Sequence, residues 1–312
     1  MRIVITGGAG FIGSHFIEKV LEKDFEVIVI DNLITGRIEN IGKYIESGKV
    51  KFIEQDVQNF IDIEEEIDVV VHLASIASPK AYSNHPVNTL KSGSLGTINS
   101  LGLAKAKSAK FLLSSTSEVY GSPLISPQTE SYWGNVNPVG PRSMYDESKR
   151  FAEAASFTYM NEFGLDVKIA RIFNTYGTKM QIDDGRVVTN FIHQALTNKD
   201  ISIYGDGTQT RSLCYVSDTV EYLFRLMNSD FKGVMNIGNP DEIQIIDLAK
   251  KIIQKTDSES KIKFLDLPQD DPEHRKPDIS LSIEKLGYEP LVSLEDGLGI
   301  LIKWVEERLK SS

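Results

Sequence analysis

The segment Thr6-Gly7-Gly8-Ala9-Gly10-Phe11-Ile12-Gly13 decides the fold predicted for this chain. It follows the β-branched run Arg2–Thr6 and opens the amphipathic stretch Phe11–Lys23, and its glycines fit both GxGxxG and GxxGxxG spacing. Glycine is required where a turn takes positive φ, where backbone approaches a pyrophosphate, and where a helix packs closely on its strand. The helix start adds N–H donors and a dipole that favour an anion. The segment therefore predicts a strand, a phosphate-binding turn and a helix.

Asp31, followed by Asn32, ends the next predicted strand, Glu26–Ile30, at about the ~20-residue distance expected of a ribose-binding carboxylate. A carboxylate accepts hydrogen bonds from both ribose hydroxyls of NAD and repels the extra phosphate of NADP, so we predict NAD as the cofactor. The alternative is a carboxylate that only stabilises the turn at the end of the strand. Other candidate cofactor contacts lie in the glycine loop and near neighbouring strand ends: Gly7, Gly10, Phe11, Ile12, Gly13, Thr35, Gly36, Asp56, Val57, Leu73 and Ala74.

Short apolar runs alternate with longer amphipathic ones through the first half of the chain, as in parallel strands joined by helical crossovers. The runs are apolar on both faces, which predicts an α/β, doubly wound (Rossmann) sheet covered by helices on each side. We predict a dinucleotide-binding domain over residues 1–174, to which 212–238 returns, and a smaller α/β lobe over 175–211 and 239–312. The predicted strands are Arg2–Thr6, Glu26–Ile30, Lys51–Ile53, Asp68–Leu73, Lys110–Ser114 and Asp166–Ile172.

Composition narrows the functional classes. The 312 residues are 41% hydrophobic and 25% charged, which is typical of a globular protein. Lys and Arg total 34 against 44 Asp and Glu, a net charge of −10, so we expect no nucleic-acid partner. A single cysteine excludes an intramolecular disulfide, and we expect neither a signal peptide nor a membrane span, since no apolar run approaches the ~20 residues that a span needs. We expect a cytoplasmic protein, and the five histidines show no metal-binding spacing.

Tyr145 and Lys149 are candidates for chemistry because an i, i+4 pair on a helix shares one face. The ammonium can then sit near the phenol and, together with a nicotinamide charge, lower its pKa toward that of a useful base. The preceding strand ends in Thr116-Ser117-Glu118, a group of hydroxyls and one carboxylate at the sheet edge where ligands of such folds bind. A solvated helix start beside a polar turn is the structural alternative.

With these motifs, the chain resembles the extended short-chain dehydrogenase/reductase family, and within it most closely the UDP-glucuronate decarboxylases. The glycines and the Tyr–Lys pair are typical of the whole superfamily, whereas Tyr132–Pro138 and the Thr-Ser-Glu triplet are far more restricted. The resemblance covers nearly the whole chain and is carried by His72–Pro79, Ser115–Gly121, Tyr132–Pro138, Tyr145–Arg150, Ala170–Thr175, Asp184–Val188 and Asp271–Asp278.

The resemblance implies conversion of UDP-glucuronate to UDP-xylose. Tyr145, assisted by Lys149, would remove the 4-hydroxyl proton while NAD⁺ takes a hydride from carbon 4, and the ketone would allow carbon dioxide to leave. The hydride would then return, so that NAD is recycled. Thr116 would hydrogen-bond the 4-oxygen, Ser117 and Glu118 would flank the carboxylate, and Arg275 resembles an arginine proposed as a proton donor.

Ser117 distinguishes the predicted decarboxylase from a 4,6-dehydratase. Related nucleotide-sugar 4,6-dehydratases carry Asp here, which would oppose a substrate carboxylate ~4 Å away by up to ~4 kcal/mol at an effective dielectric of 20. A serine hydroxyl can instead donate to the carboxylate. Glu118 leaves three alternatives open: it is protonated, it points elsewhere, or it helps to expel carbon dioxide. A nucleotide-sugar 4-epimerase or 4,6-dehydratase is the alternative activity, and a non-catalytic dinucleotide sensor is disfavoured by the retained Tyr145 and Lys149.

Arginine presents a planar fork that suits phosphate, so arginines lead the candidate substrate contacts. Surface salt bridging is their structural alternative. The resemblance also implies a homodimer formed through the helices near Val87–Ala106 and Met144–Phe163. The candidate contacts to the nucleotide sugar are Lys91, Asn174, Arg186, Arg211 and Arg275.

Overall fold

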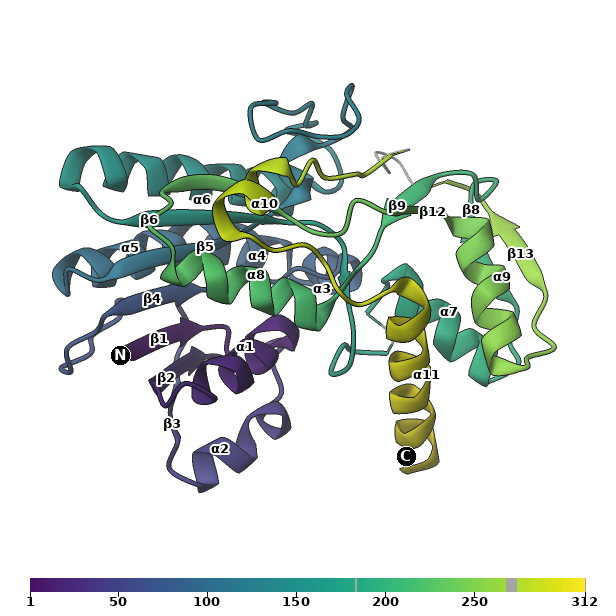
Figure 1. Ribbon diagram of the computed structural model, residues 1–312, viewed down its shortest axis with the longest axis horizontal. Coiled ribbons are helices and arrows are strands. Elements are labelled where there is room, and N and C mark those ends of the chain that lie inside the picture. The colour runs from purple at the N-terminus through teal and green to yellow at the C-terminus, as the bar shows by residue number, and fades with distance from the viewer. Residues whose placement is uncertain (183, 268–273, 312) are drawn as a thin grey trace.

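Thirteen strands run through the parts of the chain that the computed structural model describes, residues 1–182, 184–267 and 274–311. Seven of them form one parallel sheet in the order β11-β6-β5-β4-β1-β2-β3, and the others form three short pairs, β7 with β10, β8 with β13 and β9 with β12 (Figure 1). The strands are β1 (Arg2–Thr6), β2 (Glu26–Asp31), β3 (Val50–Glu54), β4 (Val69–His72), β5 (Lys110–Thr116), β6 (Val167–Ile172), β7 (Thr175–Tyr176), β8 (Ile201–Tyr204), β9 (Thr210–Ser212), β10 (Cys214–Tyr215), β11 (Gly233–Ile237), β12 (Glu242–Gln244) and β13 (Ile262–Leu265).

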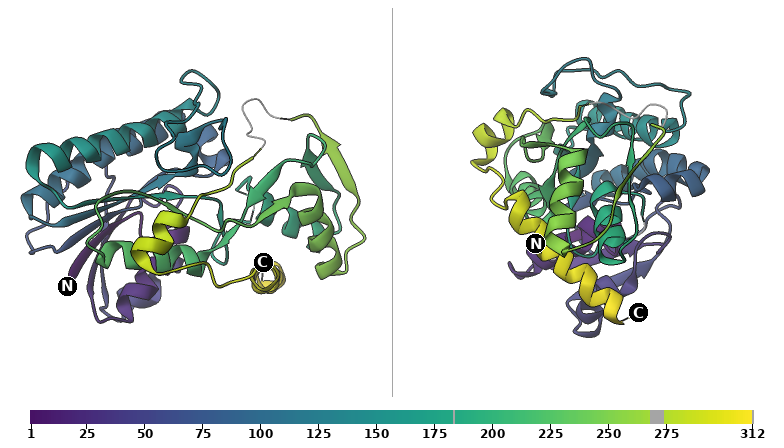
Figure 2. Two further views of the ribbon diagram at one scale, coloured as in Figure 1. Left: turned by 45° about the horizontal axis from the view of Figure 1, so that its top comes forward. Right: turned by 90° about the vertical axis from the view of Figure 1, so that its right-hand side faces the viewer.

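The helices cover both faces of the sheet, which confirms the predicted doubly wound fold. Helices α5 and α6 pack on one face and α1 and α8 on the other, as the two views of Figure 2 also show. The helices are α1 (Phe11–Leu21), α2 (Gly42–Glu46), α3 (Pro79–Asn84), α4 (Pro86–Lys91), α5 (Thr97–Ala106), α6 (Ser143–Phe163), α7 (Val187–Leu196), α8 (Val216–Asn228), α9 (Ile245–Thr256), α10 (Ser280–Leu286) and α11 (Leu294–Ser311), with short turns η1 (Ile38–Asn40), η2 (Ser92–Gly96) and η3 (Ser117–Tyr120).

Strand β1 shows why this sheet must be covered on both faces. Ile3 and Ile5 are fully buried in the core that contains Phe16 of α1, whereas Val4 between them is buried in the core that contains Ala152 of α6. Alternate side chains of a strand point to opposite faces, so a run without polar residues needs an apolar layer on each side. All six predicted strands are present, with ends that differ by no more than a few residues.

Helices α4 and α5 form one run that is interrupted by the π-helical turn η2. The turn contains Gly93, where a Cβ would lie 2.5 Å from the hydroxyl oxygen of Ser148 on α6. Glycine is therefore required here by the close approach of α6, and the extra residue of a π-turn accommodates the approach. The predicted helical region Val87–Ala106 is confirmed, although it is not a regular α-helix.

The second lobe contains α7, α9 and α11 with the β8–β13 and β9–β12 pairs, at the right in Figure 1. Its core is continuous with the α1 and α8 side of the sheet, since Phe191, Ile203 and Leu248 belong to the same cluster as Ile5. Strand β11 returns to the sheet beside β6. The division into domains stays a prediction, and within the 239–312 segment α10 packs on β11 and α8.

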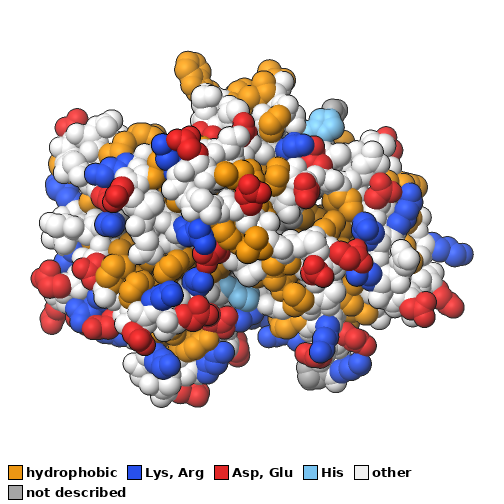
Figure 3. All heavy atoms as spheres, viewed as in Figure 1, with side chains coloured by type: hydrophobic (Ala, Val, Ile, Leu, Met, Phe, Trp, Pro, Cys, Tyr) orange, Lys and Arg blue, Asp and Glu red, His pale blue; other side chains and the backbone are white. Residues whose placement is uncertain are grey.

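Three features bear on function: the distribution of charge on the surface, the environment of the single cysteine, and the character of the helices. On the face shown in Figure 3, acidic and basic side chains are interspersed, without the continuous basic surface that phosphate-backbone binding requires. Cys214, the single cysteine, is fully buried in β10, and burial raises the pKa of its thiol to about 12. Among the described residues, none of the helices combines the length and apolar character needed to span a bilayer.

Candidate active site

A cavity of about 870 Å³ lies at the carboxyl ends of β1, β4, β5 and β6 and extends to residues of the second lobe. In open α/β sheets, this edge is where ligands bind, because the strand order reverses there. Most of the residues predicted from the sequence line it together: Gly7, Gly10, Phe11, Ile12, Gly13, Asp31, Asn32, Thr35, Gly36, Val57, Leu73, Ala74, Thr116, Ser117, Glu118, Tyr145, Lys149, Asn174, Arg186, Arg211 and Arg275.

Two predicted residues are not among those that line the cavity. The carboxylate of Asp56 accepts a hydrogen bond from the side-chain amide of Asn32 at 3.0 Å, so it supports a cavity residue from behind. Lys91 is exposed at the end of α4 and does not line the cavity, so its predicted contact with the substrate stays a prediction without support from this cavity. Of the Asp271–Asp278 motif, Asp271, Pro272 and Glu273 lie outside the described residues.

The glycine loop places backbone where a side chain would not fit. Gly7 has φ of +74°, and a Cβ there would lie 2.6 Å from the backbone nitrogen of Ala74. A Cβ on Gly13 would lie 2.3 Å from the carbonyl oxygen of Gly7. Gly10 caps α1 without a side chain of its own and lines the cavity, which leaves the first N–H groups of α1 facing a space that an anion can enter. This loop fits the pyrophosphate of a dinucleotide.

Asp31 is held in a fixed orientation at the end of β2. Its carboxylate accepts hydrogen bonds from the N–H groups of Ala9 at 3.0 Å and Leu33 at 2.9 Å. A Cβ on Gly36 would lie 2.9 Å from the same carboxylate. Burial raises the pKa of Asp31, although these backbone hydrogen bonds oppose the shift. Asp31 therefore stabilises its turn, as the structural alternative predicted, and also lines the cavity where a ribose would lie.

Tyr145 and Lys149 lie together in the first turns of α6, with the lysine nitrogen 5.9 Å from the centre of the tyrosine ring. The ammonium donates to the carbonyl oxygen of Ser114 at 2.8 Å, and burial lowers the pKa of Lys149 to about 8. Burial raises the pKa of Tyr145 above its ordinary value, although a hydrogen bond with Thr116 opposes the shift. The lowered phenol pKa that was predicted for Lys149 together with a nicotinamide charge stays a prediction, and in the protein alone burial is the dominant influence on Tyr145.

Glu118 is ionised and held between two arginines. It forms ion pairs with Arg142 and with Arg275, the second at 2.5 Å. Burial alone would raise the pKa of Glu118, but the charges of Arg275 and Arg142 lower it to about 2. Arg275 is 2% exposed and also donates to the hydroxyl of Ser117 at 3.2 Å and to the carbonyl oxygen of Gly121 at 3.0 Å. Of the three alternatives for Glu118, the protein alone adopts the one directed toward neighbouring cations.

Arg142 and Tyr82 are among the cavity residues that were not predicted from the sequence. Arg142 ends the loop before α6, and its position three residues ahead of Tyr145 was the available signal, because one helical turn separates them. Tyr82 of α3 stacks on Tyr145 with ring centres 5.5 Å apart and an interplanar angle of 14°. No sequence pattern connects Tyr82 to Tyr145, since they meet only through packing of α3 near α6.

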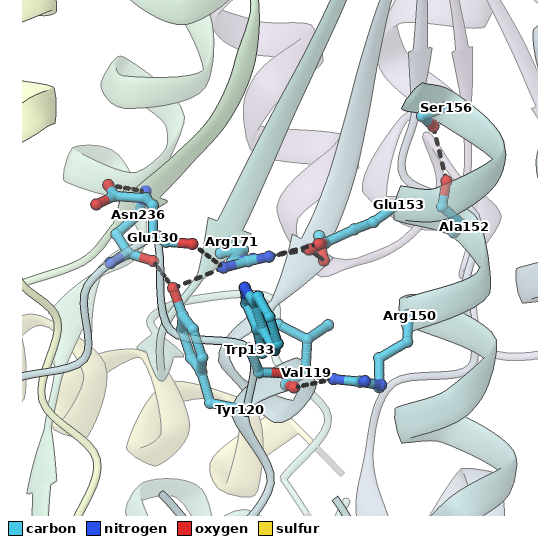
Figure 4. Close-up of polar contacts among 11 residues, drawn as sticks. Val119, Tyr120, Glu130, Trp133, Arg150, Ala152, Glu153, Ser156, Arg171 and Asn236 are labelled. Carbon is cyan, nitrogen blue, oxygen red and sulfur yellow. Dashed lines mark hydrogen bonds and ion pairs between the residues drawn. The ribbon is translucent and has the colours of Figure 1, made fainter. Parts of the chain in front are cut away.

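A second polar network supports β5 and α6 from behind (Figure 4). Arg171 on β6 forms a bidentate pair with Glu153 on α6, at 2.7 and 2.9 Å, and donates to the Tyr120 hydroxyl at 3.0 Å. Glu153 also accepts from the hydroxyl of Ser115, the residue before Thr116. The Arg171–Glu153 pair therefore links β6 to α6, and the hydrogen bond from Ser115 links β5 to the same glutamate, which lies one turn after Lys149 on α6.

The remaining predicted substrate residues line the cavity from the second half of the chain. Arg186 lies 3.5 Å from the carboxylate of Asp184, and Arg211 donates to the carbonyl oxygen of Thr210 at 2.8 Å. Both arginines therefore keep local contacts of the kind that the structural alternative expected, while their location still allows them to reach a ligand. Asn174 follows β6 at the same edge.

The sequence matches one family description and many proteins of known name. Residues 3–238 match the NAD dependent epimerase/dehydratase family. UDP-glucuronic acid decarboxylase 6 of Arabidopsis thaliana is 52% identical over 302 residues, which cover 96% of this chain and 88% of that protein. UDP-glucuronic acid decarboxylase 1 of Xenopus tropicalis is 49% identical over 309 residues, which cover 99% of this chain and 73% of that protein.

Solved structures with the same fold are more distant in sequence. UDP-glucose 4-epimerase of Thermotoga maritima, solved with UDP-glucose, superposes with a TM-score of 0.90 at 29% identity, covering 99% of this chain and 100% of that one. UDP-glucuronic acid 4-epimerase of Bacillus cereus, solved with UDP-glucuronic acid and NAD, gives a TM-score of 0.88 at 28% identity with the same coverage. The similarity in fold therefore extends over both lobes.

Proposed function

The chain belongs to the NAD dependent epimerase/dehydratase family, and from this premise we propose that it is a carboxy-lyase that converts UDP-glucuronate to UDP-xylose with NAD as a recycled cofactor. Identity to the named decarboxylases is 49–52%, against 28–29% to the 4-epimerases compared above. The observation that carries the proposal is the contact of buried Arg275 with Ser117 near the end of β5, since both groups can donate to a sugar carboxylate.

The cofactor fits the glycine loop and the end of β2. The first turn of α1 would hold the pyrophosphate, Asp31 the adenosine ribose, and Leu73 and Ala74 the middle of the dinucleotide. When bound, NAD would supply reversible hydride transfer at carbon 4 of the sugar. Tyr145 and Lys149 line the same cavity, so the proton acceptor and the cofactor share one space.

The first chemical task of the protein is to remove the proton of the 4-hydroxyl. Tyr145 is the base that we assign, and Thr116, which hydrogen-bonds to it, would hold the sugar 4-oxygen next to the phenol. Because burial raises the pKa of Tyr145 in the protein alone, a cation must be brought near it before it ionises. Lys149 already lies within the same turn, and closer approach of its ammonium would stabilise the phenolate.

The second task is to let carbon dioxide leave. With a ketone at carbon 4, the bond between carbon 5 and the carboxylate breaks and its electron pair enters an enolate, which a proton at carbon 5 then quenches. Ser117 and Arg275 would orient the carboxylate, and Glu118 holds Arg275 in place. Arg186, Arg211 and Asn174 would contact the UDP group from the second half of the chain.

A product analysis tests this proposal. Purified protein is incubated with UDP-glucuronate and no added NAD, and we expect carbon dioxide and a UDP-pentose, identified by mass. A product with the mass of the substrate, UDP-galacturonate, and no gas would instead support a 4-epimerase. Tyr145→Phe should retain NAD and lose at least about 100-fold in turnover, as expected for loss of an acid–base group. Unchanged turnover would remove Tyr145 from this role.

We also propose that the protein is a homodimer that works in the cytoplasm. The support for a dimer is a set of exposed apolar side chains on α4, η2 and α6, three elements that pack against one another. Val87 is 62% exposed, Leu95 49% and Phe151 45%, and a second copy of the same helices would bury them. Gel filtration at micromolar concentration should give twice the monomer mass, and a monomer would contradict the dimer. The cellular location stays a prediction.

A further inference from the structure

A second, smaller cavity of about 170 Å³ lies behind the reaction site. Three residues, Glu118, Arg142 and Arg275, line both this cavity and the large one, so they form the wall between the two. On its outer side the small cavity is lined by the exposed residues Ser122 and Asn135. Its polar lining suits water, and one water needs only about 10–15 Å³ of such space. The cavity thus connects the protein surface with the wall of the reaction site.

Asp146 lines the small cavity directly after Tyr145 on α6. Its side chain is buried, with 7% of the residue exposed, and among the described residues its oxygen Oδ1 has no hydrogen-bond partner. A buried ionised carboxylate without a partner is costly, and such a group either binds water or holds a proton. The large cavity is not lined by Asp146, so this residue has no part in the assignments made above.

The charges around Asp146 favour its protonated form. Burial and the carboxylate of Glu118 raise the pKa of Asp146 to about 7, while Arg142 and Arg275 oppose the shift and Glu147 adds to it. Glu118 itself stays ionised, because the same two arginines lie against it. Of the two carboxylates that line the small cavity, Asp146 is therefore the one that holds a proton near neutral pH.

The reaction of the proposed function consumes one proton in each cycle. The proton that Tyr145 removes from the 4-hydroxyl returns to the same oxygen when the ketone is reduced. The carboxylate leaves as carbon dioxide, and a new C–H bond forms at carbon 5. The balance is therefore a sugar carboxylate and one proton giving a pentose and carbon dioxide, and the proton must enter the site from solvent.

We propose that the small cavity is the entry path for this proton and that Asp146 is the acid that stores it behind the wall of Glu118, Arg142 and Arg275. This inference rests on the proposed function. In the step, the O–H bond of Asp146 breaks and the proton passes through water and a group of the wall to carbon 5. The electron pair of the enolate forms the new C–H bond. The Asp146 carboxylate then takes a proton from solvent through the opening beside Ser122 and Asn135. Asp146 does not line the reaction site, because Glu118, Arg142 and Arg275 lie between them. Its role is to hold the proton and release it to these residues, so it is a positioning residue.

The pH dependence of turnover tests this role. In the unaltered protein, kcat should fall as pH rises through about 7, because Asp146 then loses its proton. Asp146→Asn keeps the size of the side chain and removes the acid, so kcat should drop at least about tenfold at pH 6 and the fall above pH 7 should disappear. Asp146→Glu restores an acid at the same position and should restore the fall.

Single-turnover measurements separate a proton-delivery role from a purely structural one. With Asp146→Asn, carbon dioxide should appear before the UDP-pentose, because loss of the carboxylate does not need the stored proton whereas bond formation at carbon 5 does. Equal slowing of both products would indicate a structural defect and would overturn the inference, even if the variant were too slow for a pH profile.

Glu147→Gln is the matched control, since it changes the same charge on the next residue of α6. Glu147 lines neither cavity and lies 3.7 Å from Arg150 in an ion pair, so kcat of this variant at pH 6 should match the unaltered protein. The fall of kcat with rising pH should remain and begin at a slightly lower pH, because Glu147 adds to the raised pKa of Asp146. If Asp146→Asn released carbon dioxide with the same pH profile as the unaltered protein, only this inference would be overturned. No carbon dioxide from the unaltered protein would overturn the proposed function and this inference with it.

Discussion

The glycine loop and the Glu118–Arg275 cluster lie in one cavity, but they are built in opposite ways. In the loop, backbone atoms of neighbouring residues form the surface, and Gly7 and Gly13 contribute by having no side chain. In the cluster, charged side chains form the surface, and Ser117 and Arg275 meet although 158 positions separate them along the chain. The loop depends on steric exclusion between backbone atoms, which meet within the loop at Gly13 and across to Ala74 at Gly7, whereas the cluster depends on a balance of buried charges.

This difference has an energetic consequence. Adding a side-chain atom to a surface made of backbone causes a steric clash, but pH does not change the energy of such a surface. The energy of a surface made of buried charges changes with pH and with the loss of one charged partner. Four experiments test this difference between the two regions, in order of decreasing expected change in free energy.

Arg275→Met should have the largest effect, lowering the free energy of unfolding by about 3–5 kcal/mol, because it leaves the buried Glu118 with one arginine instead of two. Denaturant unfolding measures this change. The control is Lys276→Met, whose pair with Glu242 at 3.4 Å is partly exposed and should be worth less than about 1 kcal/mol. Equal small effects at both positions would mean that the cluster is not held by its charges.

Gly13→Ala should weaken NAD binding by about 100-fold, or about 2.7 kcal/mol, because the new methyl group would lie 2.3 Å from the Gly7 carbonyl oxygen and force the loop to move. Calorimetric titration with NAD measures the loss. Gly299→Ala in α11, where a Cβ meets no atom within 4 Å, should bind NAD normally. If both variants bound NAD normally, the loop could move to accommodate the methyl group without loss of affinity.

Asp146→Asn should be more stable than the unaltered protein at pH 8 and equally stable near pH 3. The folded pKa of about 7 lies above the ordinary value of 3.8, so the folded state holds a proton that the unfolded state releases. Stability from this group is therefore complete below pH 3.8 and is lost as pH rises toward 7. The expected gain at pH 8 is on the order of 2 kcal/mol in unfolding free energy. If the stability difference between the two proteins were the same at pH 8 and at pH 3, Asp146 would be ionised in the folded protein.

Asp31→Asn should have the smallest effect, about tenfold weaker NAD binding and a narrower preference for NAD over NADP. The amide keeps one acceptor for the N–H of Ala9 or Leu33 but removes the charge that repels a ribose phosphate. Titrations with both dinucleotides measure the preference, with the exposed Asp62→Asn as the control. An unaltered ratio of the two affinities would leave Asp31 with its turn-stabilising role alone.

The fold, the family and the glycine loop were predictable because their determinants are close together in the sequence. Gly7 to Gly13 and the apolar run of β1 carry their own information, and the structure and the comparisons confirm both the sheet and the family. Arg142, Tyr82 and Asp146 were missed as a group, because their roles arise only when α3, η3 and α6 pack together.

The properties that the sequence could not show have the same origin. Spacing on α6 brought Tyr145 and Lys149 together correctly, but it contained no information on desolvation, which raises the phenol pKa. Helical spacing also could not show that Lys91 is exposed, and a composition change could not show that α10 returns to β11. Burial and long-range packing decide these properties. The roles of the site residues, the dimer and the cytoplasmic location stay predictions.

The burial of Cys214 makes this chain convenient for spectroscopy. A fully buried thiol with a pKa of about 12 is almost entirely protonated at neutral pH and should not react with maleimide reagents. A cysteine introduced on the surface of each lobe would then accept a dye or spin label without removal of the native residue. Distances between such labels would report whether the two lobes move together when a dinucleotide binds.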